Sequence, residues 1–522
     1  MVKQNHPFPL SALTAGTVLS YYGTYLLNSR GFFSGSGLFS GAGWIFIAAG
    51  AALWSVFSAL SSPVLTPRRS QRVFCALGSA CAAGLVLGAA VAGRIPGPPD
   101  LGLPAGKVGA LEGVLLEDPR KTAGGNGMAR LELGQAWAFD GAAIGGAGVR
   151  SSAGGRVTAL FPGGRLEDLK EFGRNCAVYL EGVFLPPRSG ESGPGMFRAA
   201  GVHVVSPAPP LERFRTGLRQ NLVSRLSRPD NQNWGSLSLA LLLGVRDNLD
   251  SDFARSYREA GVSHVLALSG MHLAVLSALI AFLFKPGLGS RWAALIGALF
   301  IAGYVFLVGS QPSLDRAAIM YLLGAMAVVC SLARNPVSLL NLAFIAQIVW
   351  QPESGIAVSF ILSYLALWGI LRLGVKITEL FRGRLPPALL GGLSASLGAF
   401  IATASVSAAN FGELRPAGIV TGLVIVPLTS LFMILTIGYL ALDTLLPFLA
   451  RPLGMGLSAL YKTLDALVGV SAGFPGIALG SGSAGPVKTG SWLPVLGVSI
   501  LLAGLILFFA RRRARFRVPA LP

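Results

Sequence analysis

Two histidines and a serine lie close together in an apolar stretch of the sequence. His264, Ser269 and His272 belong to HVLALSGMHLAVLSALI, which we expect to cross a membrane as one helix over about 262–284. An eight-residue spacing is about 2.2 helical turns, which would place both imidazoles on roughly the same side. Polar groups at that depth are costly unless they face a cavity or a partner, so the pattern favours a functional path over satisfied core histidines. Gly270 could let the helix bend or another backbone approach.

Two further polar segments interrupt the apolar runs. The first is VGSQPSLDRAAIM, where Pro312 breaks the chain and Arg316 opens the next apolar run. The second is SAANFGELRPAG at 407–418. The residues singled out there are Asn410, Phe411, Arg415 and Pro416, with Pro427 expected as a later helix break. Irregular backbone at membrane depth is tolerated where protein or water surrounds it, and it often marks a substrate path. The alternative is a pair of ordinary loops in water.

The sequence offers little support for catalysis. Ser269 as a nucleophile would need a base from a later helix, and no histidine follows His272. The four histidines form no HExxH motif and the four cysteines no CxxC pair, so we expect no metal site. The GxGxxG match at 480–485 has no flanking strand and helix, and no P-loop motif occurs. We therefore expect neither an enzyme nor a cofactor.

Membrane helices must position the polar segments. Of 522 residues, 52% are hydrophobic and only 12% are charged, whereas soluble domains carry about 25% charged residues. A bilayer is the expected solvent, and a spanning helix needs about 20 apolar residues. We expect about twelve spans, with a margin of one or two, in a polytopic α-helical membrane protein. They lie near 10–28, 42–60, 73–93, 262–284, 292–309, 316–333, 337–350, 355–371, 388–410, 417–440, 452–471 and 491–510.

Residues 105–207 form a soluble insert with five predicted strands. The strands are Val108–Glu117, Met128–Phe139, Arg156–Phe161, Cys176–Leu185 and Phe197–Ser206. Five short strands in about 100 residues suit a small barrel such as the OB-fold. Residues 105–210 contain 11 Lys/Arg and 10 Asp/Glu, so a structural or gating role is favoured over direct binding of a nucleic-acid strand.

Five parts of the chain are expected. They are three N-terminal spans at 1–95, the β insert at 105–207, a helix at 211–230, a helical domain at 234–450, and C-terminal spans with a basic tail at 451–522. In the 211–230 helix, leucines and Phe214 recur at helical spacing among arginines. That pattern fits either an interfacial helix or packing on the insert.

Loop charge predicts the orientation. If the N-terminus is cytoplasmic, the inner loops and tail hold most of the surplus positive charge behind the formal charge of +19. Both termini are then cytoplasmic, and residues 105–207 lie outside the cell membrane. The excess positive charge is mainly a topology signal, because the insert contributes only +1.

The central blocks resemble the ComEC-type competence family, the inner-membrane channel of natural transformation. HVLALSGMHLAVL preceded by FARSYREAG, then VGSQPSLDRAAIM, SFILSYLALWGI and NFGELRPAGIVTGLVIVPL, occur in the family's order over about 234–450. The resemblance implies import of single-stranded DNA. It marks His264, Ser269, Gly270, His272, Arg316, Asn410, Gly412, Pro416 and Pro427 as candidate channel or structural positions.

The resemblance also implies partners. The expected ones are single-stranded DNA, membrane lipid, a DNA receptor outside, and a helicase or strand-binding protein inside. Many family members carry a metallo-β-lactamase-like domain, but its HxHxDH motif does not occur here, so a separate nuclease is expected. The alternative function is a secondary transporter or flippase for a small or lipid-linked anion. Such transporters commonly contain repeated spans, and no repeat is evident.

Overall fold

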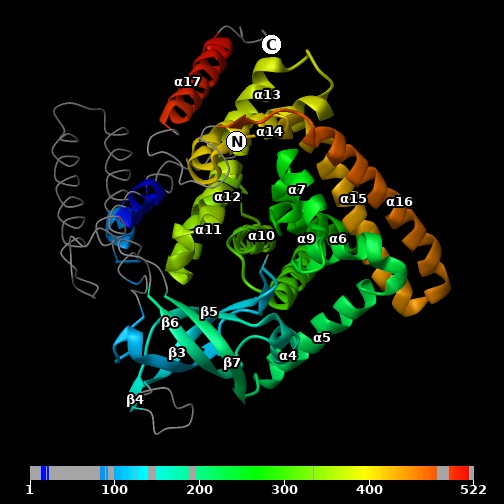
Figure 1. Ribbon diagram of the computed structural model, residues 1–522. Coiled ribbons are helices and arrows are strands. Elements are labelled where there is room, and N and C mark those ends of the chain that lie inside the picture. Colours follow the sequence, from blue (N-terminus) through cyan, green and yellow to red (C-terminus); the bar gives the residue numbers. More distant parts are fainter. Residues whose placement is uncertain are drawn as a thin grey trace, which may run out of the picture. The chain divides into compact units, whose positions relative to one another are not determined.

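The computed structural model (Figure 1) divides into two compact units. It describes residues 13–18, 20–22, 83–88, 90–91, 94, 99–122, 124–138, 149–186, 195–332, 334–478 and 493–515. The first unit comprises Met1–Val223, Phe306–Gly309 and Ile348–Glu353, and the second comprises Ser224–Val305, Ser310–Gln347 and Ser354–Pro522. The predicted span at 42–60 and the glycine motif at 480–485 lie outside the described residues.

Five strands of the first unit close into a ring. They are β1 (Val108–Leu115), β3 (Gly127–Ala138), β5 (Arg156–Phe161), β6 (Ala177–Leu185) and β7 (Met196–Ser206). All five predicted strands are present, because each is a short run rich in residues that favour strands, bounded by turn-forming segments. β1 pairs with β3 and β6, β3 with β5, and β6 with β7, all antiparallel, while β5 pairs with β7 in parallel. Short β2 (Arg120–Lys121) and β4 (Val149–Ser152) add to β3.

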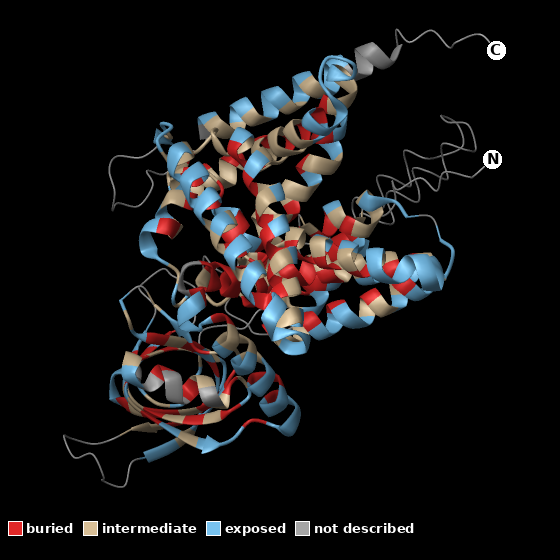
Figure 2. Cartoon of the chain, turned by 90° about the vertical axis from the view of Figure 1, so that its right-hand side faces the viewer, coloured by how far each residue is buried: buried red, intermediate tan, exposed pale blue. Residues whose placement is uncertain are grey.

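Apolar side chains fill the inside of the ring. Leu111, Val157, Leu180 and Phe197 are at most 1% exposed, and Figure 2 shows buried residues along the strands of the ring. Helix α4 (Leu166–Phe172), preceded by the short η2 (Gly163–Arg165), connects β5 to β6 and adds Leu166 and Leu169 to the same core. η1 (Ala105–Lys107) precedes β1.

Helix α5 (Pro210–Leu226) follows the ring and buries two of its charged residues, Glu212 and Arg215. Arg215 is 1% exposed, and its guanidinium bonds to Asp118, to Glu212 and to the carbonyl of Leu307. Arg219 donates to the carbonyl of Val308 over 2.9 Å. The apolar residues Leu211, Phe214 and Leu218 are instead 65%, 69% and 43% exposed.

The N-terminal helical stretches of the first unit cross closely. A Cβ on Gly84 would lie 2.1 Å from the carbonyl oxygen of Leu13, and one on Gly88 would lie 2.4 Å from that of Thr17. Gly84 and Gly88 form a GxxxG pattern, which permits this approach of two backbones.

The second unit is helical. Its elements are η3 (Pro229–Asn231), α6 (Gln232–Leu243), α7 (Ser251–Glu259), α8 (Ser263–Leu266), α9 (Gly270–Val308), α10 (Pro312–Val329), α11 (Pro336–Trp350), η4 (Pro352–Ile356), α12 (Val358–Gly369), η5 (Ile370–Gly374), α13 (Val375–Phe381), α14 (Pro387–Phe411), β8 (Glu413–Leu414), α15 (Gly418–Leu445), α16 (Pro447–Ala472), β9 (Ile477–Ala478) and α17 (Leu493–Arg515). The boundaries between the two units fall inside α5, α9, α11 and η4, so each of these elements contributes residues to both units.

Within the described ranges, five helices are long and apolar enough to span a membrane. They are Gly270–Val308, Pro312–Val329, Val358–Phe381, Pro387–Phe411 and Gly418–Leu445. This supports a helical membrane protein with a sheet domain, while the expected total of about twelve spans is not reached among these residues. The predicted spans at 262–284 and 292–309 fall largely in α9, whose 39 residues are interrupted by non-helical Gly289. The prediction of a helix break at Pro427 was wrong, because α15 continues through this proline.

Candidate functional site

The start of α9 forms the centre of the candidate site. Ala267 is extended, so the chain leaves α8 and re-enters a helix only at Gly270. His272, two residues into α9, is 0% exposed. Its Nδ1 lies 3.1 Å from the backbone nitrogen of Ser269 and 3.1 Å from Ser269 Oγ. The imidazole therefore caps its own helix from the first turn.

The predicted single helix carrying both histidines was wrong. His264 lies in α8, is exposed, and is separated from His272 by the extended residues before Gly270. The apolar composition of 262–284 concealed this break, because Ala and Leu favour a continuous helix and neither Gly nor Pro stands between His264 and Ser269. The structure thus keeps Ser269, Gly270 and His272 together and leaves His264 outside this group.

Arg316 completes the group from α10. It is 7% exposed, and its guanidinium donates to the carbonyl of Ser363 and lies over the ring of Tyr364, with Cζ 5.8 Å from the centroid. A Cβ on Gly270 would lie 3.0 Å from Arg316 Nη2. The guanidinium therefore rests against the first residue of α9, where the absence of a side chain leaves room for it. Pro312 begins α10, as expected of a proline in the first helical turn.

A network that the sequence did not reveal holds α10, α11 and α12 together. The Gln347 amide donates to the carbonyl of Pro312 over 2.9 Å and accepts from the Tyr364 hydroxyl over 2.9 Å. Ser313 and Ser363 share a hydrogen bond of 3.0 Å. The sequence signal for this network was the presence of isolated polar residues in apolar runs. It could not show that Gln347 and Tyr364 bond to each other, because they are 17 residues apart in separate helices.

Among the residues that the structure describes, two buried nitrogens of this group have no hydrogen-bond partner, His272 Nε2 and Arg316 Nε. Because His272 Nδ1 accepts from the backbone N–H of Ser269, the neutral imidazole carries its proton on Nε2. Both orphaned atoms are therefore donors. A buried donor without an acceptor costs about 1–3 kcal/mol, so the pair is suited to an oxygen acceptor from outside the chain.

The serine and histidine do not form a complete catalytic triad. Ser269 Oγ is 3.1 Å from His272 Nδ1, but in a triad an acid orients the second ring nitrogen, and His272 Nε2 is unpartnered. Among the residues the structure describes, no group of three or more His, Cys, Asp or Glu could hold a metal ion.

The 407–418 segment is separate from the group around His272 and contains the turn that follows α14. Asn410 is exposed in the last turn of α14 and donates to the Val406 carbonyl, while Phe411 is 63% exposed. Gly412 has φ of 68° and ends the helix, and β8 then pairs with β9. Arg415, just before Pro416, pairs with Glu413 over 2.9 Å and packs at Gly261 and Gly476. These contacts place Arg415 beside the turn after α7.

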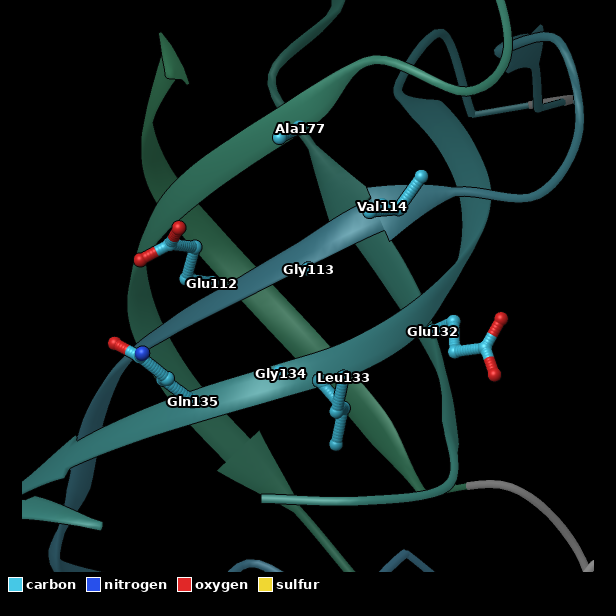
Figure 3. A pocket seen from close by; sticks show the side chains of 8 residues that line it. All are labelled: Glu112, Gly113, Val114, Glu132, Leu133, Gly134, Gln135 and Ala177. Carbon is cyan, nitrogen blue, oxygen red and sulfur yellow. The ribbon is translucent and has the colours of Figure 1, made fainter. Parts of the chain in front are cut away.

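A pocket on β1 and β3 is poorly suited to a nucleic-acid strand (Figure 3). Its lining contains two carboxylates and no Lys or Arg, so it would repel phosphate. The lining residues are Glu112, Gly113, Val114, Glu132, Leu133, Gly134, Gln135 and Ala177.

Comparison with known proteins identifies relatives of this chain. The chain is 31% identical over 158 residues to ComE operon protein 3 of Bacillus subtilis strain 168, covering 28% of this chain and 20% of that protein. It is 28% identical over 263 residues to an uncharacterized protein of Aquifex aeolicus strain VF5, covering 49% of this chain and 60% of that one. The chain thus spans less than two thirds of either relative. No solved structure matches.

The family comparison covers the candidate site. The model described as Competence protein matches residues 241–513, which include α9, α10 and α12. Because that match extends over more than half of the sequence, the chain belongs to the Competence protein family.

Proposed function

We propose that this protein is an inner-membrane channel that imports single-stranded DNA during transformation. Family membership and the five apolar helices support this role. The observation that carries it is the pair of buried donors, His272 Nε2–H and Arg316 Nε–H, for which the described part of the chain supplies no acceptor. Phosphodiester oxygens of a passing strand are acceptors of the required kind, and Arg is well suited to phosphate.

In this proposal the β domain is an external OB-type barrel. The closed ring, the parallel β5–β7 pair and the position of α4 between β5 and β6 support the assignment. The exposed apolar residues of α5 support contact of that helix with lipid headgroups. Both termini would be cytoplasmic in the cell membrane, as the loop charges favour.

The driving force and strand processing would come from other proteins. We propose a DNA receptor outside and a helicase or strand-binding protein inside, with the second strand degraded by a nuclease. We assign no strand cleavage and no other enzymatic role to residues 1–522.

Gene deletion tests this function. In a transformable host, label from added DNA that is protected from external nuclease should fall to background in the deletion strain, and the wild-type gene should restore it. Label bound to the cell surface should persist, because binding precedes transport. Unchanged protected label in the deletion strain would contradict the proposal.

A further inference from the structure

Helix α7 has one apolar face and one charged face. Phe253 is 4% exposed and Tyr257 is 0% exposed. On the other face, the side chains of Asp252 and Arg255 are 74% and 63% exposed and pair over 2.7 Å. Arg258 is also exposed. The sequence alone indicates only a solvated helix here, so its surroundings decide its role.

The apolar face packs along the hairpin of α15 and α16. Phe253 stacks on Tyr461 of α16, with centroids 5.2 Å apart and planes at 14°. After α7, a Cβ on Gly261 would lie 3.1 Å from the Cα of Gly418, the first residue of α15. Helix α7 therefore lies beside the half of the hairpin that contains the start of α15 and the end of α16.

The depth of this contact follows from helix length. Tyr461 lies about 16 Å from the end of α16 at Ala472, at 1.5 Å per residue. The 28 residues of α15 span about 42 Å, against a hydrocarbon thickness of about 30 Å. If α15 is centred in the bilayer, about 6 Å of the hairpin extends beyond the hydrocarbon at each end. Phe253 contacts α16 about 16 Å from its end and therefore lies roughly 10 Å inside the hydrocarbon boundary. Helix α15 is long and apolar enough to span a membrane and exposes Val424 and Leu431, as expected for contact with lipid.

We propose that the charged face of α7 lines a water-filled recess within the membrane domain. Asp252, Arg255 and Arg258 are too costly to expose to hydrocarbon at that depth, and the apolar face already fixes the helix against α16. Water is therefore the occupant of the space in front of these side chains. The recess is part of the aqueous path of the proposed channel, but the inference rests on insertion of α15 and does not depend on the cargo.

Cysteine labelling tests the recess. Cys75, Cys81, Cys176 and Cys330 are first replaced by Ser, and Asp252→Cys, Arg255→Cys or Leu431→Cys is then introduced singly. Leu431, 46% exposed on α15 at a similar depth, is the matched control for contact with lipid. A charged, membrane-impermeant maleimide is applied to spheroplasts and to inverted vesicles, with the membrane content of each variant measured.

The expected result is labelling of Asp252→Cys and Arg255→Cys at least about tenfold faster than Leu431→Cys from one side of the membrane. Equally slow labelling of all three would place α7 away from water, and equally fast labelling would place the hairpin itself in water. Either result overturns the inference. The assay needs no DNA, so a failure of the proposed DNA transport would leave the labelling pattern unchanged.

Discussion

His272 and Ser269 are joined twice, because His272 Nδ1 lies 3.1 Å from both the backbone nitrogen and the hydroxyl of Ser269. These contacts fix the ring so that Nε2–H is the free donor. We predict that His272→Ala lowers DNA import by about tenfold or more, consistent with loss of an interaction worth about 1.4 kcal/mol. Protected label per unit of protein in the membrane measures the effect. His264→Ala, at an exposed position, is the control and should retain wild-type import. Wild-type import by His272→Ala would indicate that His272 has only a packing role.

Arg316 should require its guanidinium and not only its charge. Arg316→Lys retains the positive charge but cannot reproduce the planar contact with Tyr364 and the bond to the Ser363 carbonyl together. We expect import to fall about tenfold in Arg316→Lys and further in Arg316→Gln. Arg334→Gln, at an exposed position, should import normally. Full import by Arg316→Lys would show that a point charge suffices.

Arg215 should stabilise the junction between α5 and the β domain. Its side chain is 0% exposed between Asp118 and Glu212, and removing one partner from a buried ionic group costs about 3–5 kcal/mol. Arg215→Met should therefore speed hydrogen exchange in β1 and α5. Arg213→Met, on the exposed side of the same helix, should change little. Equal exchange in the two variants would argue against a stabilising role for the ion pairs of Arg215 with Asp118 and Glu212.

Asp118 makes the same junction sensitive to acid. Burial alone would raise the pKa of Asp118, but the Arg215 hydrogen bond and the charges of Arg219, Arg215 and Arg174 bring it below its ordinary value. The stabilisation is therefore complete above the unfolded-state pKa, about 3.9, and is lost as pH falls through the lower folded-state value. Protection from hydrogen exchange in β1, corrected for the intrinsic exchange rate at each pH, should fall between about pH 4 and pH 2 in the wild type. Asp118→Asn should be less stable at pH 7 and show less of this acid dependence; an identical acid dependence would assign it to other groups.

Gly261 should be required for the turn between α7 and α8. Its φ is 74°, and an added Cβ would meet Arg415 Cβ at 2.9 Å, so both backbone strain and a clash oppose substitution. Gly261→Ala should lower the thermal midpoint of the purified protein in detergent. Gly456→Ala, where an added Cβ meets nothing within 4 Å in α16, should not lower it. A normal midpoint for Gly261→Ala would indicate that this turn can adjust.

The predictable parts of the fold are those with a strong local pattern. The alternation in Arg156–Phe161 gives β5 at the predicted bounds, and Pro312 begins α10 where the sequence breaks. The start of α9 was not predictable, because residues on both sides of Ser269 are apolar and the capping contact depends on one imidazole rotamer. The bonds from Gln347 to Pro312 and Tyr364 depend on packing between helices, which periodicity does not encode. Pro427 stays inside α15, in keeping with the tolerance of membrane helices for an internal proline.

Crosslinking of a strand held in transit tests the central claim most directly. p-Benzoylphenylalanine replaces Tyr364, whose ring contacts Arg316, or Tyr439, which packs against Trp234. Radiolabelled DNA with a streptavidin block at its trailing end is added to competent cells, and the cells are illuminated. We predict light-dependent crosslinks to the labelled strand from position 364 and none from position 439. Labelled DNA that reaches the cytoplasm without crosslinking at position 364 would contradict a path past His272 and Arg316.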